Sequence, residues 1–173
     1  MTVTTPQTTS EPVFFEQTWD LSYRHALGET VGSFLQGVKD KKLLGRRCPV
    51  CTRVLFPARS FCDRDHVATE EYVEVGHTGV LEMFTIVYEA FPGMRVAPPY
   101  VLAYALLDGA DTAVVGYVKG MDLSDVKAAS GRLTVGTPLV VRFQEKPEGA
   151  VTDFWFELAD SGEETAGAAP DLG

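Results

Sequence analysis

Three cysteines and one aspartate in the first half of the chain have the spacing of a metal site. Cys48, Cys51 and Cys62 are the only cysteines among the 173 residues. Cys48 and Cys51 form a C-x2-C pair, in which a tight turn lets both thiolates face one tetrahedral ion. Asp65 follows Cys62 at the same spacing, and His66 comes next. We therefore expect a four-coordinate zinc site that takes three of its ligands from the cysteines.

The identity of the fourth ligand is open between Asp65 and His66, because zinc accepts either a carboxylate oxygen or an imidazole nitrogen. Asp65 keeps the spacing of the first pair, so we assign the site to Cys48, Cys51, Cys62 and Asp65. The alternative is a site that has lost its metal and keeps the cysteines as small buried residues. Three thiolates and a fourth protein ligand leave no coordination position for a substrate, so we expect the zinc to be structural.

Few other residues are candidates for catalysis. The histidines are His25, His66 and His77, and none has serine, cysteine or acidic partners at a meaningful spacing. A thioredoxin-like redox pair is disfavoured, because Cys48-Pro-Val-Cys51 does not open a helix within a βαβ unit. The phosphate-binding patterns G-x-G-x-x-G and G-x-x-x-x-G-K-[ST] do not occur. We therefore expect no catalytic activity from this chain alone.

The elements around the cysteines predict a mainly β fold with N-terminal helices. Apolar residues with helical spacing cover 29–42, and two short hairpin arms around the cysteines predict a rubredoxin-like zinc ribbon. After residue 71, apolar runs separated by Gly and Pro predict strands at 79–88, 100–107, 112–118, 138–145 and 152–158. A helical stretch at 122–131 lies between the third and fourth strands, which is the order of a five-stranded OB-fold barrel. An open six-stranded meander fits the periodicity nearly as well.

Composition divides the chain into five segments. The small polar residues of 1–12 and 161–173 predict disordered ends. Between them we place an aromatic arm and helix at 13–42, the zinc ribbon at 43–70 and the OB-fold at 71–160. The arm contains Phe14, Phe15, Trp19 and Tyr23. A segment this aromatic either packs back on the domain or docks a partner, and the sequence favours neither.

Charge limits the possible partners. The chain has 15 Lys and Arg against 24 Asp and Glu, a formal net charge of −9. Because a protein that binds nucleic acid through phosphates normally carries the opposite sign, we expect no nucleic acid partner. A single-stranded nucleic-acid-binding OB-fold with a structural zinc is kept as the alternative function. No apolar run approaches the roughly 20 residues of a membrane span. The N-terminus lacks the regions of a signal peptide, so we expect a cytoplasmic protein without membrane contact.

The order of these motifs resembles the DUF35 family of zinc-ribbon/OB-fold proteins associated with acyl-CoA enzymes. The resemblance runs from about residue 14 to residue 158. It is carried by the segments 23–29, 34–35, 43–51, 53–62, 79–85, 98–100 and 107–112. The family usually has a C-x2-C pair at the second knuckle, where this chain has Asp65.

The resemblance implies a non-catalytic accessory subunit of a thiolase-superfamily enzyme, such as a thiolase, acyltransferase or aldolase. In such hetero-oligomers the ribbon and N-terminal helices dock on the partner, and the barrel helps to bind or gate the acyl-CoA substrate. On this view Phe91, Met94 and Tyr100 could shelter the pantetheine arm. Arg95 and Lys119 could contact the nucleotide phosphates.

Overall fold

The computed structural model describes residues 24, 26–94 and 96–159. Several predictions concern residues outside this part of the chain: the two ends, Phe14, Phe15, Trp19 and Tyr23 of the arm, His25 and Arg95. Within the described part, neither helix has the length and apolarity that a membrane span requires.

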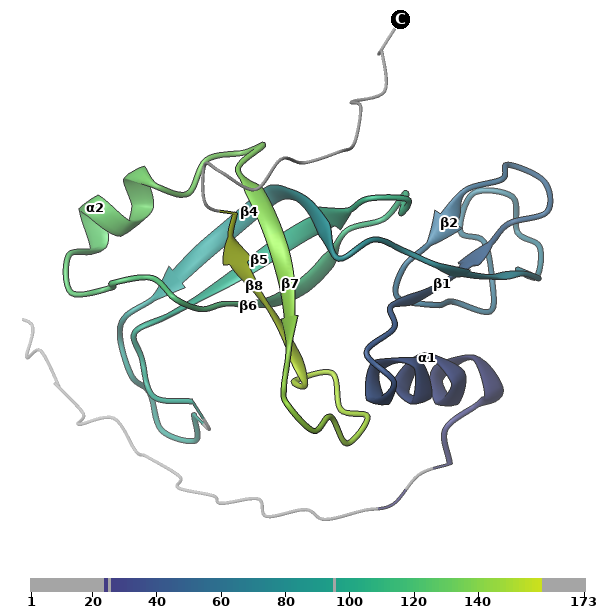
Figure 1. The fold of residues 1–173 in the computed structure, drawn as a ribbon, viewed down its shortest axis with the longest axis horizontal. Helices are drawn as coiled ribbons and strands as arrows, with labels where there is room; N and C mark the ends of the chain where they lie inside the picture. The colour runs from purple at the N-terminus through teal and green to yellow at the C-terminus, as the bar shows by residue number, and fades with distance from the viewer. Residues whose placement is uncertain (1–23, 25, 95, 160–173) are drawn as a thin grey trace, which may run out of the picture.

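The described chain has a helix, a small ribbon sheet and a barrel (Figure 1). Helix α1 (Glu29–Lys39) precedes the sheet of order β2-β1-β3, whose strands are β1 (Leu44–Arg47), β2 (Val54–Leu55) and β3 (Tyr72–Glu74). The closed barrel has the order β4-β5-β6-β8-β7. Its elements are β4 (Thr78–Val87), β5 (Tyr100–Leu107), β6 (Val114–Val118), α2 (Val126–Gly131), β7 (Pro138–Phe143) and β8 (Phe154–Leu158).

The barrel confirms the predicted OB-fold. Five strands close on themselves, with α2 between the third and fourth, so the open meander is wrong. β4 and β5 approach closely because Gly79 has no side chain. A methyl group there would lie 2.3 Å from the carbonyl oxygen of Leu106, which is shorter than any tolerable contact. In β5, buried and more exposed residues alternate, as the pleat of a strand requires.

Helix α1 ends three residues earlier than predicted, at Lys39 instead of residue 42. The N–H of Lys42 donates to Gly37 O (2.8 Å) and that of Lys41 to Val38 O (3.0 Å). Lys41 has a φ of 58°, so these two bonds form a Schellman motif that stops the helix. Helical spacing alone did not reveal this end, because Lys occupies the position that Gly usually takes.

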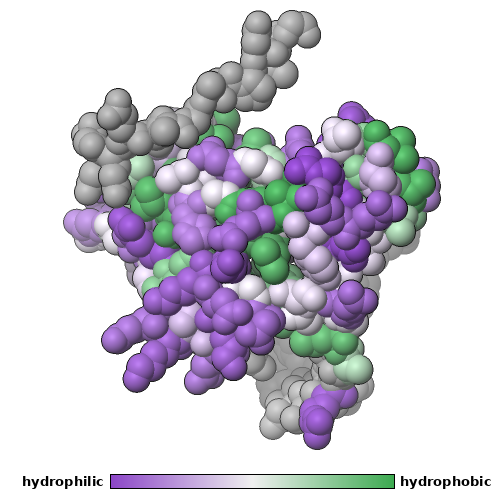
Figure 2. Space-filling view, turned by 45° about the vertical axis from the view of Figure 1, so that its right-hand side comes forward, coloured by the Kyte–Doolittle hydropathy of each residue, from purple (hydrophilic) through white to green (hydrophobic). Residues whose placement is uncertain are grey.

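One hydrophobic core joins the helix, the ribbon and the barrel. The ring of Phe34 from α1 meets that of Phe56 from the ribbon edge to face, with centroids 5.9 Å apart. The same core continues through Val38, Leu43, Val54, Leu81 and Phe156. Some apolar surface nevertheless stays uncovered: Figure 2 shows hydrophobic patches among the hydrophilic residues of one face. The three parts thus form one packed unit with apolar surface left for contacts.

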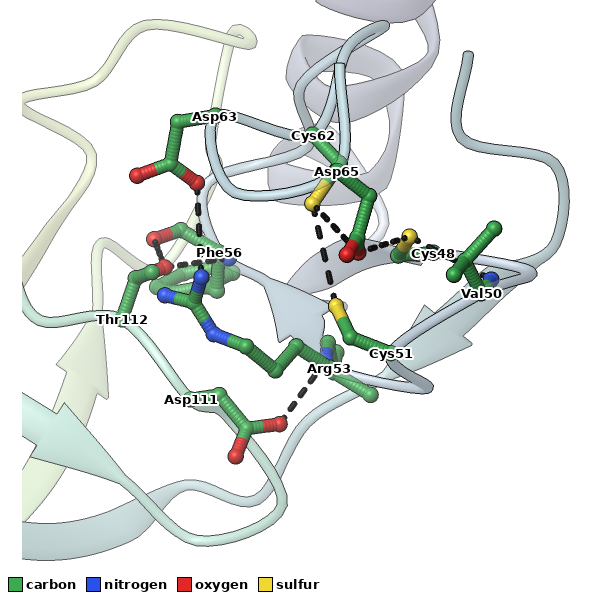
Figure 3. A network of polar contacts seen from close by, with 11 residues as sticks. Cys48, Val50, Cys51, Arg53, Phe56, Cys62, Asp63, Asp65, Asp111 and Thr112 are labelled. Carbon is green, nitrogen blue, oxygen red and sulfur yellow. Dashed lines mark hydrogen bonds and ion pairs between the residues drawn. The ribbon is translucent and has the colours of Figure 1, made fainter. Parts of the chain in front are cut away.

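The turn between β5 and β6 continues the pairing of β2. The Asp111 carboxylate accepts a hydrogen bond from Val54 N–H (2.8 Å), and Asp111 N–H donates to Val54 O (2.9 Å). The hydroxyl of Thr112 accepts from Phe56 N–H (2.8 Å) and donates to Phe56 O (2.7 Å). Figure 3 shows both residues beside the ribbon. These contacts hold the ribbon in a fixed position on the barrel.

Arg46 ties α1 to the ribbon. Its Nη1 donates to Thr30 Oγ1 (3.0 Å), and its Nη2 donates to the carbonyl oxygens of Thr69 (2.7 Å) and Glu70 (2.8 Å). The guanidinium carbon lies 4.8 Å from the centroid of the Tyr72 ring. One side chain therefore joins the first turn of the helix to the segment that leads into β3.

The loop between β7 and β8 is organised by Asp153, which is buried. Its Oδ2 accepts from the N–H groups of Glu148, Gly149 and Ala150 at 2.7–2.8 Å, and its Oδ1 accepts from Gln144 Nε2 at 2.8 Å. The bond from Ala150 contributes most to holding the pKa of Asp153 below its usual range, against the opposing effect of burial. The ionised carboxylate is thus the form that the loop stabilises.

We expect Asp153→Asn to lower the free energy of unfolding by about 1–3 kcal/mol at pH 7, because buried donors lose a charged acceptor. Since the folded pKa is depressed, this stabilisation is complete above the ordinary carboxyl value of 3.8 and disappears as the pH falls through the folded value. Urea unfolding of both proteins at pH 7 and pH 3 measures the difference. If the two proteins differ as much in their free energy of unfolding at pH 3 as at pH 7, the ionised Asp153 carboxylate is not what stabilises the loop.

Candidate metal centre

The first knuckle is a turn closed by two backbone hydrogen bonds. The N–H of Cys48 donates to Arg53 O (2.9 Å), and the N–H of Thr52 donates to Cys48 O (3.1 Å). Thr52, the residue after Cys51, has a left-handed backbone conformation with a φ of 63°. The N–H of Val50 also points at the Cys48 sulfur, 3.4 Å away. This turn brings the side chains of Cys48 and Cys51 to the same side.

The second knuckle repeats this pattern. The N–H of Cys62 donates to Val67 O (2.9 Å), the N–H of His66 donates to Cys62 O (3.0 Å), and His66 has a φ of 56°. Position by position, Asp65 therefore corresponds to Cys51 and His66 to Thr52. The backbone places Asp65 where a ligand is needed and His66 at the exit of the turn.

The four side chains converge on one point (Figure 3). The ligand atoms of Cys48, Cys51, Cys62 and Asp65 all lie within 4.8 Å of one another. The sulfurs of Cys51 and Cys62 are 3.7 Å apart, and Asp65 Oδ2 is 3.1 Å from the sulfur of Cys48 and 3.3 Å from that of Cys62. Tetrahedral zinc with Zn–S bonds of about 2.3 Å requires a sulfur separation of about 3.8 Å. The donor set and its spacing therefore fit a metal ion.

His66 is not part of this group. Its side chain is exposed, and its ring lies 5.9 Å from the ring of Phe61. Of the two candidates for the fourth position, the structure brings only the Asp65 carboxylate to the three sulfurs.

The cluster favours an ionised carboxylate. Hydrogen bonds from the thiols of Cys51 and then Cys48 lower the pKa of Asp65 to about 2. The same carboxylate is the main cause that raises the pKa of Cys51 to about 12. Backbone N–H groups, that of Asp65 first, lower the pKa of Cys62. Without a metal the cluster thus keeps a proton on Cys51, and a metal ion would have to displace it.

Two interactions outside the ligands support the knuckles. Arg53 Nη1 lies 3.4 Å from Asp63 Oδ1, so a partly exposed ion pair joins the first knuckle to the second. Such an exposed pair contributes little to the free energy of unfolding. It is nevertheless a direct side-chain contact between the two turns. Leu55, which is fully buried, packs with Cys48 and Cys62 in a small core of their own.

The residues expected near a coenzyme lie elsewhere, on the barrel. Phe91 is exposed, and its N–H points at the sulfur of Met94, 3.3 Å away in the same loop. Tyr100 stacks edge to face on Tyr117 with centroids 5.6 Å apart. The ammonium of Lys119 lies over the ring of Trp155, 3.9 Å from its centroid. These side chains do not form one site with the cysteines.

The contribution of Asp111 and Thr112 was not predicted from the sequence, which gave Thr112 only as the first residue of a strand. They position β2, and β2 follows the first knuckle directly. A short polar turn gives no sequence signal for pairing with a strand more than fifty residues earlier. The contact between the β5–β6 turn and β2 is seen only in the folded structure, where the two segments lie side by side.

We expect the purified protein to hold one metal ion per chain and Asp65→Ala to weaken its retention. The loss should exceed the roughly 10–100-fold in affinity that removal of a supporting outer-shell group costs. His66→Ala is the matched control and should retain the wild-type affinity. Elemental analysis after dialysis against a graded series of chelator concentrations measures both. If His66→Ala loses the metal while Asp65→Ala keeps it, the ligand assignment is wrong.

The barrel matches a known protein family by sequence. Residues 72–144 match the family model described as ChsH2, C-terminal OB-fold domain. A search of curated proteins gave no match.

Two solved structures are similar to most of the chain. A DUF35-family protein of unknown function from Sulfolobus solfataricus has a TM-score of 0.55 at 22% identity, covering 76% of this chain and 87% of its own. A chain of the Ltp2–ChsH2(DUF35) aldolase has a TM-score of 0.58 at 20% identity, covering 78% of this chain and 98% of its own. At these identities the likeness shows a common fold. Together with the match of the barrel, it confirms the resemblance of this chain to the DUF35 family.

Proposed function

We propose that the protein is a non-catalytic accessory subunit that docks on a thiolase-like enzyme and helps to bind or gate its acyl-CoA substrate. The observation that carries this proposal is the match of the barrel to the ChsH2 OB-fold domain, together with the shared fold of a chain from the Ltp2–ChsH2(DUF35) aldolase. Among residues 24, 26–94 and 96–159, the Cys48–Asp65 cluster is the one grouping of three or more potential metal ligands. With all four of its side chains as ligands, a metal bound here would have no open catalytic position.

The metal is proposed to be zinc in a structural role. Three thiolates and one carboxylate suit zinc, and a closed set of four protein ligands is typical of structural sites. The knuckles bury only Cys48, Leu55 and Cys62 in their own core, which is too small to hold two turns together. Metal binding in small zinc modules supplies about 10–16 kcal/mol of apparent free energy, and here it would hold the knuckles in place.

The tip of the ribbon has the composition of a docking surface. Val50 and Phe61 stand on the two knuckles, with 63% and 50% of their surface exposed. The ring of His66 lies beside that of Phe61. Aromatic and apolar anchors held on a rigid support supply most of the free energy of protein association. We therefore place the main contact with the enzyme at this tip.

The barrel is proposed to lie beside the acyl-CoA entrance of the enzyme. Support comes from Phe91, an exposed aromatic in the loop between β4 and β5, which could shelter an apolar pantetheine arm. The partner enzyme would hold the reacting groups, and this chain would restrict access of water and competing ligands to them.

One observation favours the alternative of a single-stranded nucleic-acid binder. Tyr104 of β5 and Tyr88, which directly follows β4, are exposed. Exposed aromatics can stack bases, but such proteins also need a basic groove. The net charge of −9 opposes binding to phosphates, so the accessory role is the better supported function.

The docking proposal is tested by co-expression with a thiolase-like enzyme from the same genome. We expect the two to co-purify and Phe61→Ala or Val50→Asp to weaken the complex by about 1–2 kcal/mol, roughly a five- to thirtyfold rise in Kd. Val135→Asp is the control, because Val135 is exposed on the barrel and outside the ribbon. Unchanged affinity of both tip variants, measured by biolayer interferometry, would exclude the tip as the main contact.

The alternative is tested on the isolated protein. We expect no retention of a single-stranded oligonucleotide at micromolar protein and low salt, because the chain lacks net positive charge. We also expect no turnover of acyl-CoA substrates by the chain alone. Filter binding and a thiol-release assay measure these two properties. Oligonucleotide binding at micromolar concentration would favour the alternative function.

A further inference from the structure

The outer face of β4, β5 and β6 carries mostly apolar and tyrosine side chains, with Thr85 paired to Leu102. Met83 pairs with Tyr104 and Tyr104 with Val115, so these three side chains form a row across the strands. Leu102 pairs with Tyr117 in the next row. The inner face of the same strands is the barrel core. Antiparallel strands with one solvated face normally carry polar residues on it, so a sheet that is mostly apolar on both faces indicates a covered outer face.

Two hollows lie in this face. The larger has a volume of about 300 Å³ and extends from Val115 and Tyr117 to Phe34 of α1 and Val151 of the β7–β8 loop. The smaller has about 210 Å³ and extends toward Met83. They share Leu102 and Val115, so they form one furrow. Among the residues that the structure describes, none that lines either hollow is charged.

Exposed apolar residues continue from the furrow along α1. Phe34 lines the larger hollow, Val31 lies about one turn earlier in α1, and Leu27 stands just before the N-cap Gly28. Val31 and Leu27 are both exposed large hydrophobic residues. The uncovered surface thus extends from the barrel to the point where the preceding chain enters α1.

The preceding chain matches this surface in composition. Large apolar residues stand at every fourth position from Phe15 through Trp19, Tyr23 and Leu27 to Val31. Phe14 adds a further aromatic ring, so the segment before α1 is rich in large apolar side chains of the kind that could cover this surface. We infer that the segment 13–23 packs back into the furrow on β4–β6 in the free protein, with Trp19 among the inserted side chains.

The segment is long enough to reach the furrow. Phe34 lies five residues into α1, which is about 8 Å along the helix axis. Trp19 stands ten residues before α1 and can extend to about 33 Å from its start. The reach therefore exceeds the distance along the helix severalfold.

A tethered segment suits the furrow better than a small ligand. Ligand pockets contain a few placed polar groups that orient the ligand, and here the lining offers little beyond the hydroxyls of tyrosine and threonine. A covalently linked segment needs no such groups, because its effective concentration is of millimolar order. It also loses less translational freedom than a separate molecule.

The experiment uses the two tryptophans of the chain, Trp19 and Trp155. In the metal-loaded full-length Trp155→Phe variant, Trp19 is the sole reporter. We expect its emission to be blue-shifted and its acrylamide quenching constant to be several-fold below that of free N-acetyltryptophanamide. Val115→Glu places a charge where the hollows meet and should restore quenching to nearly the free value. Met83→Glu in the smaller hollow should act in the same direction.

The control is Val135→Glu, since Val135 is 78% exposed and lines neither hollow. It should leave Trp19 shielded. Folding is checked with the matched Trp19→Phe series, in which Trp155 emission must be the same with and without Val115→Glu. Free quenching of Trp19 in the starting variant, or shielding that neither furrow variant removes, would overturn the inference. Shielding that depends on protein concentration would also overturn it, because a second copy would then supply the cover.

Discussion

The convergence of three cysteine sulfurs and the Asp65 carboxylate is the constraint on which the ribbon depends. The two knuckles share a backbone pattern and almost no core, so little besides the cluster holds them face to face. Their tips carry Val50 and Phe61 on the surface. The cluster can in this way determine whether these two side chains stay together on one surface.

A partner that binds the ribbon tip meets the barrel in a defined orientation only if the position of the ribbon on the barrel is fixed. The backbone contacts of Asp111 and Thr112 with β2 and the shared core around Phe34 and Phe56 provide this. A partner bound at the ribbon tip would therefore also find the barrel loops in a defined place. This coupling is the structural basis for proposing that one small chain both docks on an enzyme and covers part of its substrate entrance.

Local signals in the sequence were sufficient for much of this picture. The C-x2-C spacing identified the knuckles, and apolar alternation identified the five barrel strands to within a few residues. The spacing of Asp65 favoured the residue whose carboxylate the structure places beside the three sulfurs, and its role as a metal ligand stays a prediction. The Schellman end of α1 at Lys41 was not predicted because Lys takes the position that Gly usually occupies. The pairing of Asp111 with β2 and the exposure of the barrel tyrosines were not predictable either, because they depend on which distant segments become neighbours.

We propose that a metal ion bound by this cluster maintains the surface that docks on a partner enzyme. The most direct measurement compares the affinity of the metal-loaded and chelated protein for the thiolase-like partner, with the fold of the barrel followed by NMR. The account predicts that chelation abolishes or strongly weakens binding while the barrel resonances are retained, and that added zinc restores it. Equal affinity of the two forms, with the ribbon resonances lost on chelation, would contradict it.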